Sequence, residues 1–332
     1  MSSPGKIRAL LATLRIANAP SVVSNVFLGY MVGWAFWFGG WNPSDTEVID
    51  WLSLVLLCGS GLLLYFAGNL ANDWFDRHWD AERRPERALP SGLFRPGLYL
   101  ACSILFASAG CLLAFSESTA CGLCAVAIAG LIAVYTWIHK RTMWGVVPMG
   151  LCRAGLYLLG HAAWIVEWRE LEASGIDAAS TYLNLAITAA CMASGLMAYI
   201  CGLSISARYE GMEDPPQGPR VISLLLLIFP LLAMPCLWMY ENPLFGIAGM
   251  IPYASWLAYC RLRLRRPVPR YVSGLLAGIP LVDLIAAISL SLNLEFVERQ
   301  GVADFPLFWL VVAVPLTAFA AGRALQRLAP AT

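Results

Sequence analysis

Charged residues are scarce in this chain. Asp, Glu, Lys and Arg make up 13% of its 332 residues, whereas soluble domains carry about 25%. There is no low-complexity tract, and the longest hydrophilic stretches are only residues 72–96 and 207–220. This shortage excludes a soluble domain of any size and predicts one membrane domain over residues 1–332. The formal net charge of +1 identifies no partner; we expect membrane lipid, and no nucleic acid, around the chain.

Cysteine pairs with metal-binding spacing are also lacking, apart from one. The chain has ten cysteines, most of them inside apolar runs, where a free cysteine behaves as a small apolar residue. Cys121 and Cys124 form a Cys-x-x-Cys pair, but no second pair accompanies it. The cysteines therefore indicate packing rather than a disulfide framework or a zinc site.

Long apolar runs dominate the sequence instead. Ten of them approach or exceed the roughly 18 to 20 residues that a helix needs to cross a bilayer. They cover residues 9–38, 51–71, 97–116, 119–138, 144–166, 181–206, 221–240, 244–262, 272–294 and 305–327. The sequence thus predicts an all-α polytopic membrane protein with about nine to ten transmembrane helices.

Basic residues lie almost entirely on one side of these runs. With the N-terminus placed in the cytoplasm, only Arg169 and Arg299 of the 22 Lys and Arg residues fall in the opposite loops, and Arg153 falls inside a span. This asymmetry follows the positive-inside rule. We expect a multi-pass integral membrane protein whose two termini and two long hydrophilic stretches are cytoplasmic.

The first hydrophilic stretch begins with an acidic cluster at the end of an apolar helix. Its polar residues are Asn72, Asp73, Asp76 and Asp80. The three aspartates are spaced three and four residues apart, so they project from neighbouring positions on one helix face. Carboxylates this close repel one another unless a cation lies between them. Oxygen ligands in this number suit Mg²⁺, which usually bridges to a phosphate. The cluster predicts metal–diphosphate chemistry at a membrane surface.

The second stretch carries a similar pair on the same predicted side. Glu210 and Asp214 have the same spacing as Asp76 and Asp80. A second metal-binding pair is the hypothesis we favour, and a solvated acidic loop is the alternative. Gly211 and Pro215 weaken the prediction that a helix continues through this segment.

Basic side chains near these clusters are candidates for binding a diphosphate. Guanidinium groups present planar donors to phosphate oxygens, and an ammonium group could reach them too. The alternative is that these residues only follow the positive-inside rule or extend toward the interface. The candidates are Arg83, Arg87, Lys140, Arg141 and Arg208.

Two further charges lie well inside apolar runs. Arg153 and Asp283 could pair with each other, which would be structural, or face an acceptor substrate, since a charge inside the membrane pairs internally or lines a cavity. Asn18 and Tyr135 are additional acceptor-side candidates. For Asn18, hydrogen bonding between helices is the favoured alternative.

Taken together, these motifs resemble those of a known family. The pattern Asn72-Asp73-x-x-Asp76-x-x-x-Asp80, followed by Arg87-x-Leu89-Pro90-Ser91-Gly92, is similar to the first signature of the UbiA superfamily of intramembrane prenyltransferases. Tyr135 and Lys140 resemble another family position, and Glu210-x-x-x-Asp214 resembles the second acidic motif. The likeness extends over about residues 10 to 240.

The resemblance implies a helical bundle around a central cavity. It also implies that both acidic motifs act catalytically, holding Mg²⁺ and an isoprenyl diphosphate at the cytoplasmic mouth, with the lipid tail inside the membrane. Loss of diphosphate would leave an allylic cation that alkylates an aromatic or other electron-rich acceptor. Two features depart from the family pattern: ten apolar runs where nine spans are usual, and Glu210 in place of aspartate. The sequences around Arg153 and Arg208 are similar to those of the EboC-type branch of this superfamily.

Two other functions remain open at this point. A CDP-alcohol phosphotransferase also uses acidic motifs in the membrane, but the Asp-Gly that should precede Ala207-Arg208 is missing. A non-catalytic transporter or assembly subunit for a secondary metabolite could keep the same fold, and the buried charges Arg153 and Asp283 keep that alternative in view.

Overall fold

Helices make up the regular structure throughout the part of the chain that the structure describes. The computed structural model describes residues 5–38, 49–165, 178–209, 216–235, 242–298 and 305–329. The α-helices are α1 (Lys6–Thr13), α2 (Ala19–Phe38), α3 (Trp51–Arg83), α4 (Pro96–Glu117), α5 (Thr119–Ile138), α6 (Val146–His161), α8 (Ala178–Arg208), α9 (Gln217–Ile228), α10 (Pro230–Ala233), α11 (Pro243–Arg263), α12 (Val268–Ala277), α13 (Ile279–Glu298) and α14 (Phe305–Leu328). Short 3₁₀ turns cover Ile16–Asn18, Met143–Gly145 and Ala162–Trp164.

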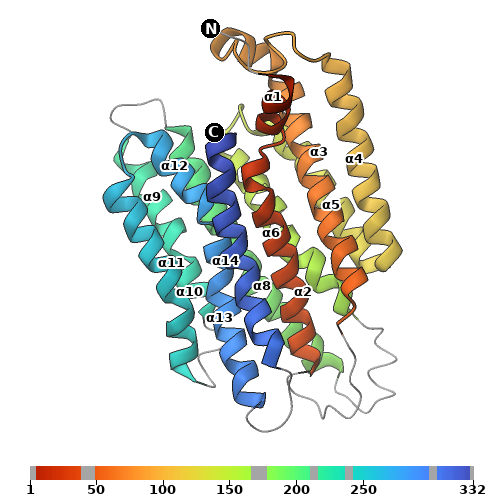
Figure 1. Cartoon of the computed structure of the whole chain (residues 1–332), viewed down its shortest axis with the longest axis vertical. Coiled ribbons are helices and arrows are strands. Elements are labelled where there is room, and N and C mark those ends of the chain that lie inside the picture. The colour runs from red at the N-terminus through yellow and green to blue at the C-terminus, as the bar shows by residue number, and fades with distance from the viewer. Residues whose placement is uncertain are drawn as a thin grey trace.

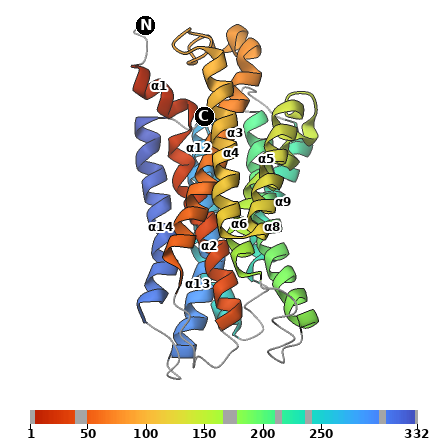
Figure 2. The ribbon, with the colours of Figure 1, turned by 90° about the vertical axis from the view of Figure 1, so that its right-hand side faces the viewer.

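The long helices run side by side along one axis, as a membrane bundle requires (Figures 1 and 2). Seven helical segments within the described residues are long and apolar enough to span a bilayer. The predicted all-α multi-pass membrane protein is therefore confirmed, whereas the predicted count of nine to ten spans is not. Both chain ends lie at the same end of the bundle (Figure 1). Which side of the membrane this end faces stays a prediction.

Helix α13 occupies the centre of one half of the bundle. It packs against α2, α8, α11 and α14, and its residues Leu284, Ile285 and Ala286 are fully buried. The other half is formed by α3, α4, α5 and α6, which pack on one another in chain order. Helices α2, α6 and α8 join the two halves.

The interface between α2 and α6 depends on glycine. A Cβ atom on Gly29 would lie 2.2 Å from the carbonyl oxygen of Tyr157, and one on Gly160 would lie 2.2 Å from that of Val26. Small residues let two membrane helices approach closely enough for their backbones to touch. These two positions therefore set the close contact that brings polar side chains of α2 and α6 together.

The first apolar run departs from the prediction of one continuous span over residues 9–38. It breaks between α1 and α2, where Arg15 adopts a left-handed conformation with φ 46°. The break frees backbone carbonyls that an intact helix would use, and α3 satisfies them: Asn69 donates to the Leu14 carbonyl at 3.0 Å, and the Tyr65 hydroxyl donates to that of Arg15 at 3.0 Å. Tertiary contacts thus outweigh the apolar pattern here.

Helix α3 continues well past the predicted end of its apolar run at residue 71. Its N-terminus is capped by Asp50, whose carboxylate accepts from the backbone of Leu52 and Ser53, a strong helix-starting arrangement. The helix ends only at Arg83. The predicted acidic cluster therefore lies on the last turns of a regular helix, as its spacing indicates.

Candidate functional site

A cavity of about 780 Å³ lies where the ends of α3, α5 and α8 meet. Charged side chains line its mouth: Asp76, Asp80, Arg83, Arg87, Lys140 and Arg208. Apolar side chains line its interior: Leu64, Ile128, Ile132, Leu156, Ile200 and Leu276. A cavity of this kind matches a molecule with an anionic head and an apolar tail.

Asp76 and Asp80 are buried carboxylates on the last turns of α3. Asp76 lies 2.9 Å from the Lys140 ammonium and 3.2 Å from Nε2 of His139. Asp80 accepts a hydrogen bond of 2.7 Å from the Arg87 guanidinium. Each carboxylate thus has a cationic or polar partner that a charged ligand at the mouth would also contact.

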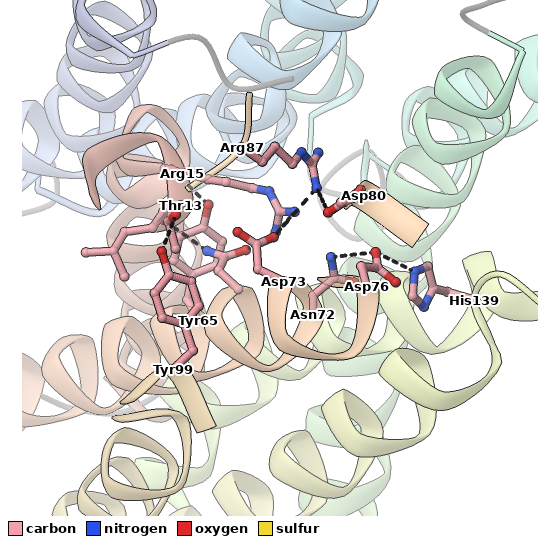
Figure 3. Close-up of polar contacts among 12 residues, drawn as sticks. Thr13, Arg15, Tyr65, Asn72, Asp73, Asp76, Asp80, Arg87, Tyr99 and His139 are labelled. Atoms are coloured by element: carbon pink, nitrogen blue, oxygen red, sulfur yellow. Dashed lines mark hydrogen bonds and ion pairs between the residues drawn. The ribbon is translucent and has the colours of Figure 1, made fainter. Parts of the chain in front are cut away.

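Asp73 lies one turn earlier and does not line the cavity. Its carboxylate is 3.5 Å from Arg15 and 3.8 Å from Arg87, so Arg87 lies between Asp73 and Asp80 (Figure 3). Arg15 in turn donates to Oδ1 of Asn69 at 2.5 Å. Burial lowers the pKa of Arg15 and the Asp73 carboxylate raises it; the net direction is upward, which keeps Arg15 cationic.

The donor set at the mouth fits a hard divalent cation. Oδ1 of Asn72 lines this region, is buried and has no hydrogen-bond partner, while Nδ2 of the same side chain donates to Asp76 at 3.3 Å. Mg²⁺ takes oxygen ligands, usually one or two carboxylates together with substrate phosphates, and Asn72 adds an unused amide oxygen near Asp76. Over the described ranges, however, no three Asp, Glu, His or Cys side chains gather closely enough to hold a metal alone. The predicted ligands Glu210 and Asp214 lie outside the described residues.

The predicted diphosphate-binding residues separate into two groups. Arg83, Arg87, Lys140 and Arg208 line the cavity. Arg141 is absent from its lining, and its guanidinium instead lies over the Trp137 ring at 5.1 Å. Arg208 also donates to the backbone carbonyls of His139 and Thr142. This contact fixes the end of α8 against the end of α5.

The acceptor-side candidates separate in the same way. Asn18, Tyr135 and Arg153 line the cavity, and Asp283 does not. Oδ1 of Asn18 is buried and has no hydrogen-bond partner. The role favoured from the sequence, hydrogen bonding between helices, therefore does not involve this oxygen. Arg153 lies 5.1 Å from the centre of the Tyr65 ring, which places its charge on the cavity wall.

Asp283 belongs to a buried polar network that connects three helices. Its carboxylate accepts hydrogen bonds from Ser24 and from Asn25 of α2, the latter at 2.8 Å, and from Tyr157 of α6 at 2.5 Å. Arg153 donates to Oδ1 of the same Asn25 at 3.4 Å. The two intramembrane charges are therefore linked through Asn25, and no direct ion pair joins these two described residues.

Sequence reasoning missed several residues of the site: Arg15, Tyr65, Asn69, Trp79 and His139. Two of them carried a usable signal. Asn69 precedes Asn72 and Asp73 by three and four residues, which puts it on the same helix face. His139 stands directly before Lys140. Arg15 carried none, because its position depends on the break before α2.

Comparisons with known proteins agree with this arrangement. The profile of the UbiA prenyltransferase family matches residues 26–204. The digeranylgeranylglyceryl phosphate synthase of Methanosarcina mazei is 28% identical over 156 residues, which cover 46% of this chain and 54% of that protein. The one from Methanothermobacter thermautotrophicus is 29% identical over 206 residues, covering 56% and 68%. The chain spans about half the length of the first of these relatives.

Solved structures share the fold. A digeranylgeranylglyceryl phosphate synthase superposes with a TM-score of 0.57 at 18% identity, covering 88% of this chain and 100% of that one. A UbiA homologue from Aeropyrum pernix K1 gives 0.50 at 14% identity, covering 92% and 98%. The family profile covers more than half of the sequence and includes the acidic cluster of α3 and the Lys140 segment. This chain belongs to the UbiA prenyltransferase family.

Proposed function

We propose that this protein transfers an isoprenyl group from an isoprenyl diphosphate to an electron-rich acceptor inside the membrane, with Mg²⁺ as cofactor. The observation that carries the proposal is the continuity of one cavity from a charged mouth to an apolar interior. The mouth suits a diphosphate, and the interior suits an isoprenyl chain. Family membership supports the same reaction class.

Asn72, Asp76 and Asp80 are the described residues that would hold the metal. Their side chains are buried, and Oδ1 of Asn72 has no hydrogen-bond partner. Magnesium, when bound, neutralises charge that builds on a diphosphate leaving group. Glu210 and Asp214 are proposed to complete the ligand set. Asp73 lies outside the cavity lining. We propose that it orients Arg15 and Arg87 through its ion pairs with them.

Lys140, Arg83 and Arg87 would bind the diphosphate oxygens. Lys140 contacts Asp76 and Arg87 contacts Asp80, so both cations are already positioned beside the carboxylates. Donors fixed in place before reaction stabilise charge as it develops. Arg208 would close the same mouth from the end of α8.

The cavity walls would protect the isoprenyl cation that remains when diphosphate leaves. Ile128, Ile132 and Leu156 form apolar walls, and excluding water prevents loss of a reactive intermediate. Tyr135 lines the same space, where its ring face can stabilise a cation. The acceptor would enter from the side of Asn18 and Arg153.

The relatives suggest which acceptor to test first. Their name describes a glyceryl phosphate carrying two geranylgeranyl groups, so we propose a glyceryl phosphate lipid with one such group as the first candidate. Its free hydroxyl is electron-rich, as the proposed reaction needs. An aromatic acceptor is the second candidate. The family match gives no support to a CDP-alcohol phosphotransferase.

Binding of geranyl, farnesyl and geranylgeranyl diphosphate to the purified protein tests the proposal. A ligand that binds the folded state raises the apparent melting temperature, so we expect a shift with Mg²⁺ that EDTA abolishes. Asp76→Asn should remove the shift. Glu82→Ala is the matched control, because Glu82 lies exposed on the same helix and does not line the cavity.

Turnover then separates an enzyme from a non-catalytic relative. Transfer of radiolabelled isoprenyl groups to the glyceryl phosphate lipid should fall about 100-fold or more in Asp76→Asn, the order lost when one stabilising group is removed. An equal melting shift in Asp76→Asn and wild type would contradict the proposed site. Binding without transfer to either acceptor class would favour the transporter or assembly subunit.

A further inference from the structure

A cation without an ion-pair partner lies on the cavity wall, well inside the mouth. Arg153 is buried in the middle of α6 and lines the cavity. Both of its hydrogen bonds come from Nη1, which donates to Ser21 at 3.0 Å and to Asn25 at 3.4 Å. The described part of the chain offers this guanidinium no ion pair.

Two nitrogens of the same guanidinium are left for a ligand. Nε and Nη2 of Arg153 make no hydrogen bond with a described residue. Neither nitrogen is enclosed by protein, so both are open to the cavity. A charge at membrane depth is costly, and it pairs internally or lines a pathway or cavity for a substrate. Planar N–H donors of arginine match the oxygens of a carboxylate or a phosphate. The open side of Arg153 therefore suits an anion.

A second unused donor lies beside Arg153. The side chain of Asn18 is buried and lines the cavity, and it makes no hydrogen bond with a described residue. Its Oδ1 is enclosed by protein and its Nδ2 is not, so Nδ2 is the atom that the cavity can reach. Ser21 connects the two residues, because its hydroxyl donates to the Asn18 carbonyl at 2.6 Å and accepts from Arg153. An amide N–H next to a guanidinium adds an uncharged donor for the same anion.

The depth of Arg153 separates it from the diphosphate. Its guanidinium lies 5.1 Å from the centre of the Tyr65 ring. Tyr65 precedes Asp76 on α3 by a separation of about 16 Å, at 1.5 Å per helical residue. A diphosphate held at the mouth beside Asp76 and Lys140 is therefore out of reach of Arg153.

The isoprenyl chain cannot supply the anion either, because it carries no charge. An apolar chain is better placed against the side chains that α5 and α8 contribute, such as Ile128, Ile132 and Ile200, than against a guanidinium that has lost its water. Of the reactants in prenyl transfer, the acceptor is left as the one that can meet Arg153.

We propose that Arg153 and Asn18 bind an anionic group of the acceptor, so that the acceptor of this protein is an acid. This inference rests on the proposed prenyl transfer and adds the charge of the acceptor to it. A glyceryl phosphate lipid would supply the anion as a phosphate, and an aromatic acceptor would supply it as a carboxylate. With the anion held inside the cavity, the electron-rich end of the acceptor is left to face the diphosphate at the mouth.

The test measures binding to the purified full-length protein in neutral detergent by melting temperature, without Mg²⁺ and without diphosphate. Two pairs of probes differ only in charge. Geranylgeranylglyceryl phosphate is compared with neutral geranylgeranylglycerol, and 4-hydroxyphenylacetate is compared with neutral 4-hydroxyphenylacetamide. The pair in which the acid binds better identifies the anion as a phosphate or a carboxylate.

Arg153→Gln tests the residue, because glutamine removes the charge and keeps a planar donor. In wild type we expect one acid to bind about tenfold or more tightly than its neutral partner, the order of a hydrogen bond to a charged group. Arg153→Gln should abolish that preference, and Arg153→Lys should retain part of it. Arg141→Gln is the matched control: it also removes one positive charge, but Arg141 is absent from the cavity lining.

Two further readouts separate acceptor binding from a structural role. In the transfer assay, Arg153→Gln should raise the KM for the acceptor about tenfold and leave the KM for the isoprenyl diphosphate unchanged. The magnesium-dependent melting shift with isoprenyl diphosphate should also be unchanged. If Arg153→Gln fails to fold, Asn18→Ala replaces it, since that change breaks no side-chain hydrogen bond to a described residue; it should weaken binding of the acid and spare its neutral partner.

Three results would overturn the proposal. Equal binding of acid and neutral partner in both pairs would mean that the cavity does not recognise an anion. Binding of none of the four compounds would exclude both classes of acid. An equal loss of acid, neutral partner and diphosphate binding in Arg153→Gln would make Arg153 structural. Failure of the proposed function has a different signature, the absence of a magnesium-dependent diphosphate shift in wild type.

Discussion

Replacing Asp283 with leucine should destabilise the protein without directly affecting the cavity at the ends of α3, α5 and α8. Asp283 is fully buried and accepts hydrogen bonds from Ser24, Asn25 and Tyr157. Leucine has a similar size and accepts none, so three buried donors from two other helices lose their acceptor. Hydrogen bonds between membrane helices contribute about 0.6 kcal/mol each on average and about 1.7 kcal/mol at most. The expected loss of unfolding free energy is therefore roughly 2–5 kcal/mol.

Equilibrium unfolding in mixed detergent and sodium dodecyl sulfate micelles measures this loss. Tyr157→Phe provides the matched second change, because it removes one donor and keeps the ring. The two changes should be strongly non-additive, since Tyr157→Phe in the Asp283→Leu background removes a donor that has already lost its acceptor. Such coupling would show that the bond between α6 and α13 holds the helices together.

A different result would refute this reasoning. If Asp283→Leu unfolds within about 0.5 kcal/mol of wild type, an amount typical of changes outside buried networks, the network is not structural. Loss of prenyl transfer at unchanged stability would instead place Asp283 on the acceptor side, the alternative that the sequence left open. Because Asp283 does not line the cavity, we expect the structural outcome.

Three further changes test the bundle and its cavity. Gly160→Ala should lower the melting temperature measurably, because its Cβ would lie 2.2 Å from the Val26 carbonyl oxygen. Lys140→Met should weaken diphosphate binding in calorimetry by roughly tenfold, the order of one charge-assisted hydrogen bond, while Arg141→Met, which lies off the cavity, should not. Ile128→Trp narrows the apolar interior, so geranylgeranyl diphosphate should lose more binding than geranyl diphosphate; equal losses would contradict the placement of the tail.

The acidic cluster shows how far helix geometry alone can predict a site. The spacing of Asp73, Asp76 and Asp80 places them on neighbouring positions of one face, and the structure has them on the last turns of α3. Spacing does not say which cation each carboxylate meets. His139 lies 63 residues from Asp76 in the chain, and Arg15 reaches Asp73 only because the first apolar run breaks. Partners of this kind depend on tertiary structure, which periodicity does not contain.

The predicted number of membrane spans stays unconfirmed for a related reason. Hydropathy counts apolar length, and it cannot detect where an apolar run breaks. The predicted span over residues 221–240 becomes the short helices α9 and α10 in its described part, with Pro230 at the start of the second. The predicted span over residues 272–294, in contrast, corresponds to one candidate span over Val268–Leu292, although it comprises two helices, α12 and α13. Runs that look alike by composition thus form helices of different lengths.

The sequence does contain a signal for the partners of the two intramembrane charges, Arg153 and Asp283. Taken singly, Arg153 and Asp283 have no assigned partner, and pairing with each other is the simplest hypothesis. On α2, however, Ser21, Ser24 and Asn25 recur at i, i+3 and i+4, which forms a polar stripe on one helix face. In the structure this stripe serves both charges: Arg153 donates to Ser21 and Asn25, and Asp283 accepts from Ser24 and Asn25.

An uncharged stripe between two opposite charges has a physical advantage over a direct ion pair. A buried ion pair must offset the desolvation of both ions through one contact, whereas the stripe gives each ion several hydrogen bonds from neutral side chains, which cost less to bury than a charge does. It also leaves Arg153 on the cavity wall, where it lies beside Tyr65, and keeps Asp283 away from the cavity. The polar face of α2 therefore separates a charge that can meet a substrate from one that holds helices together.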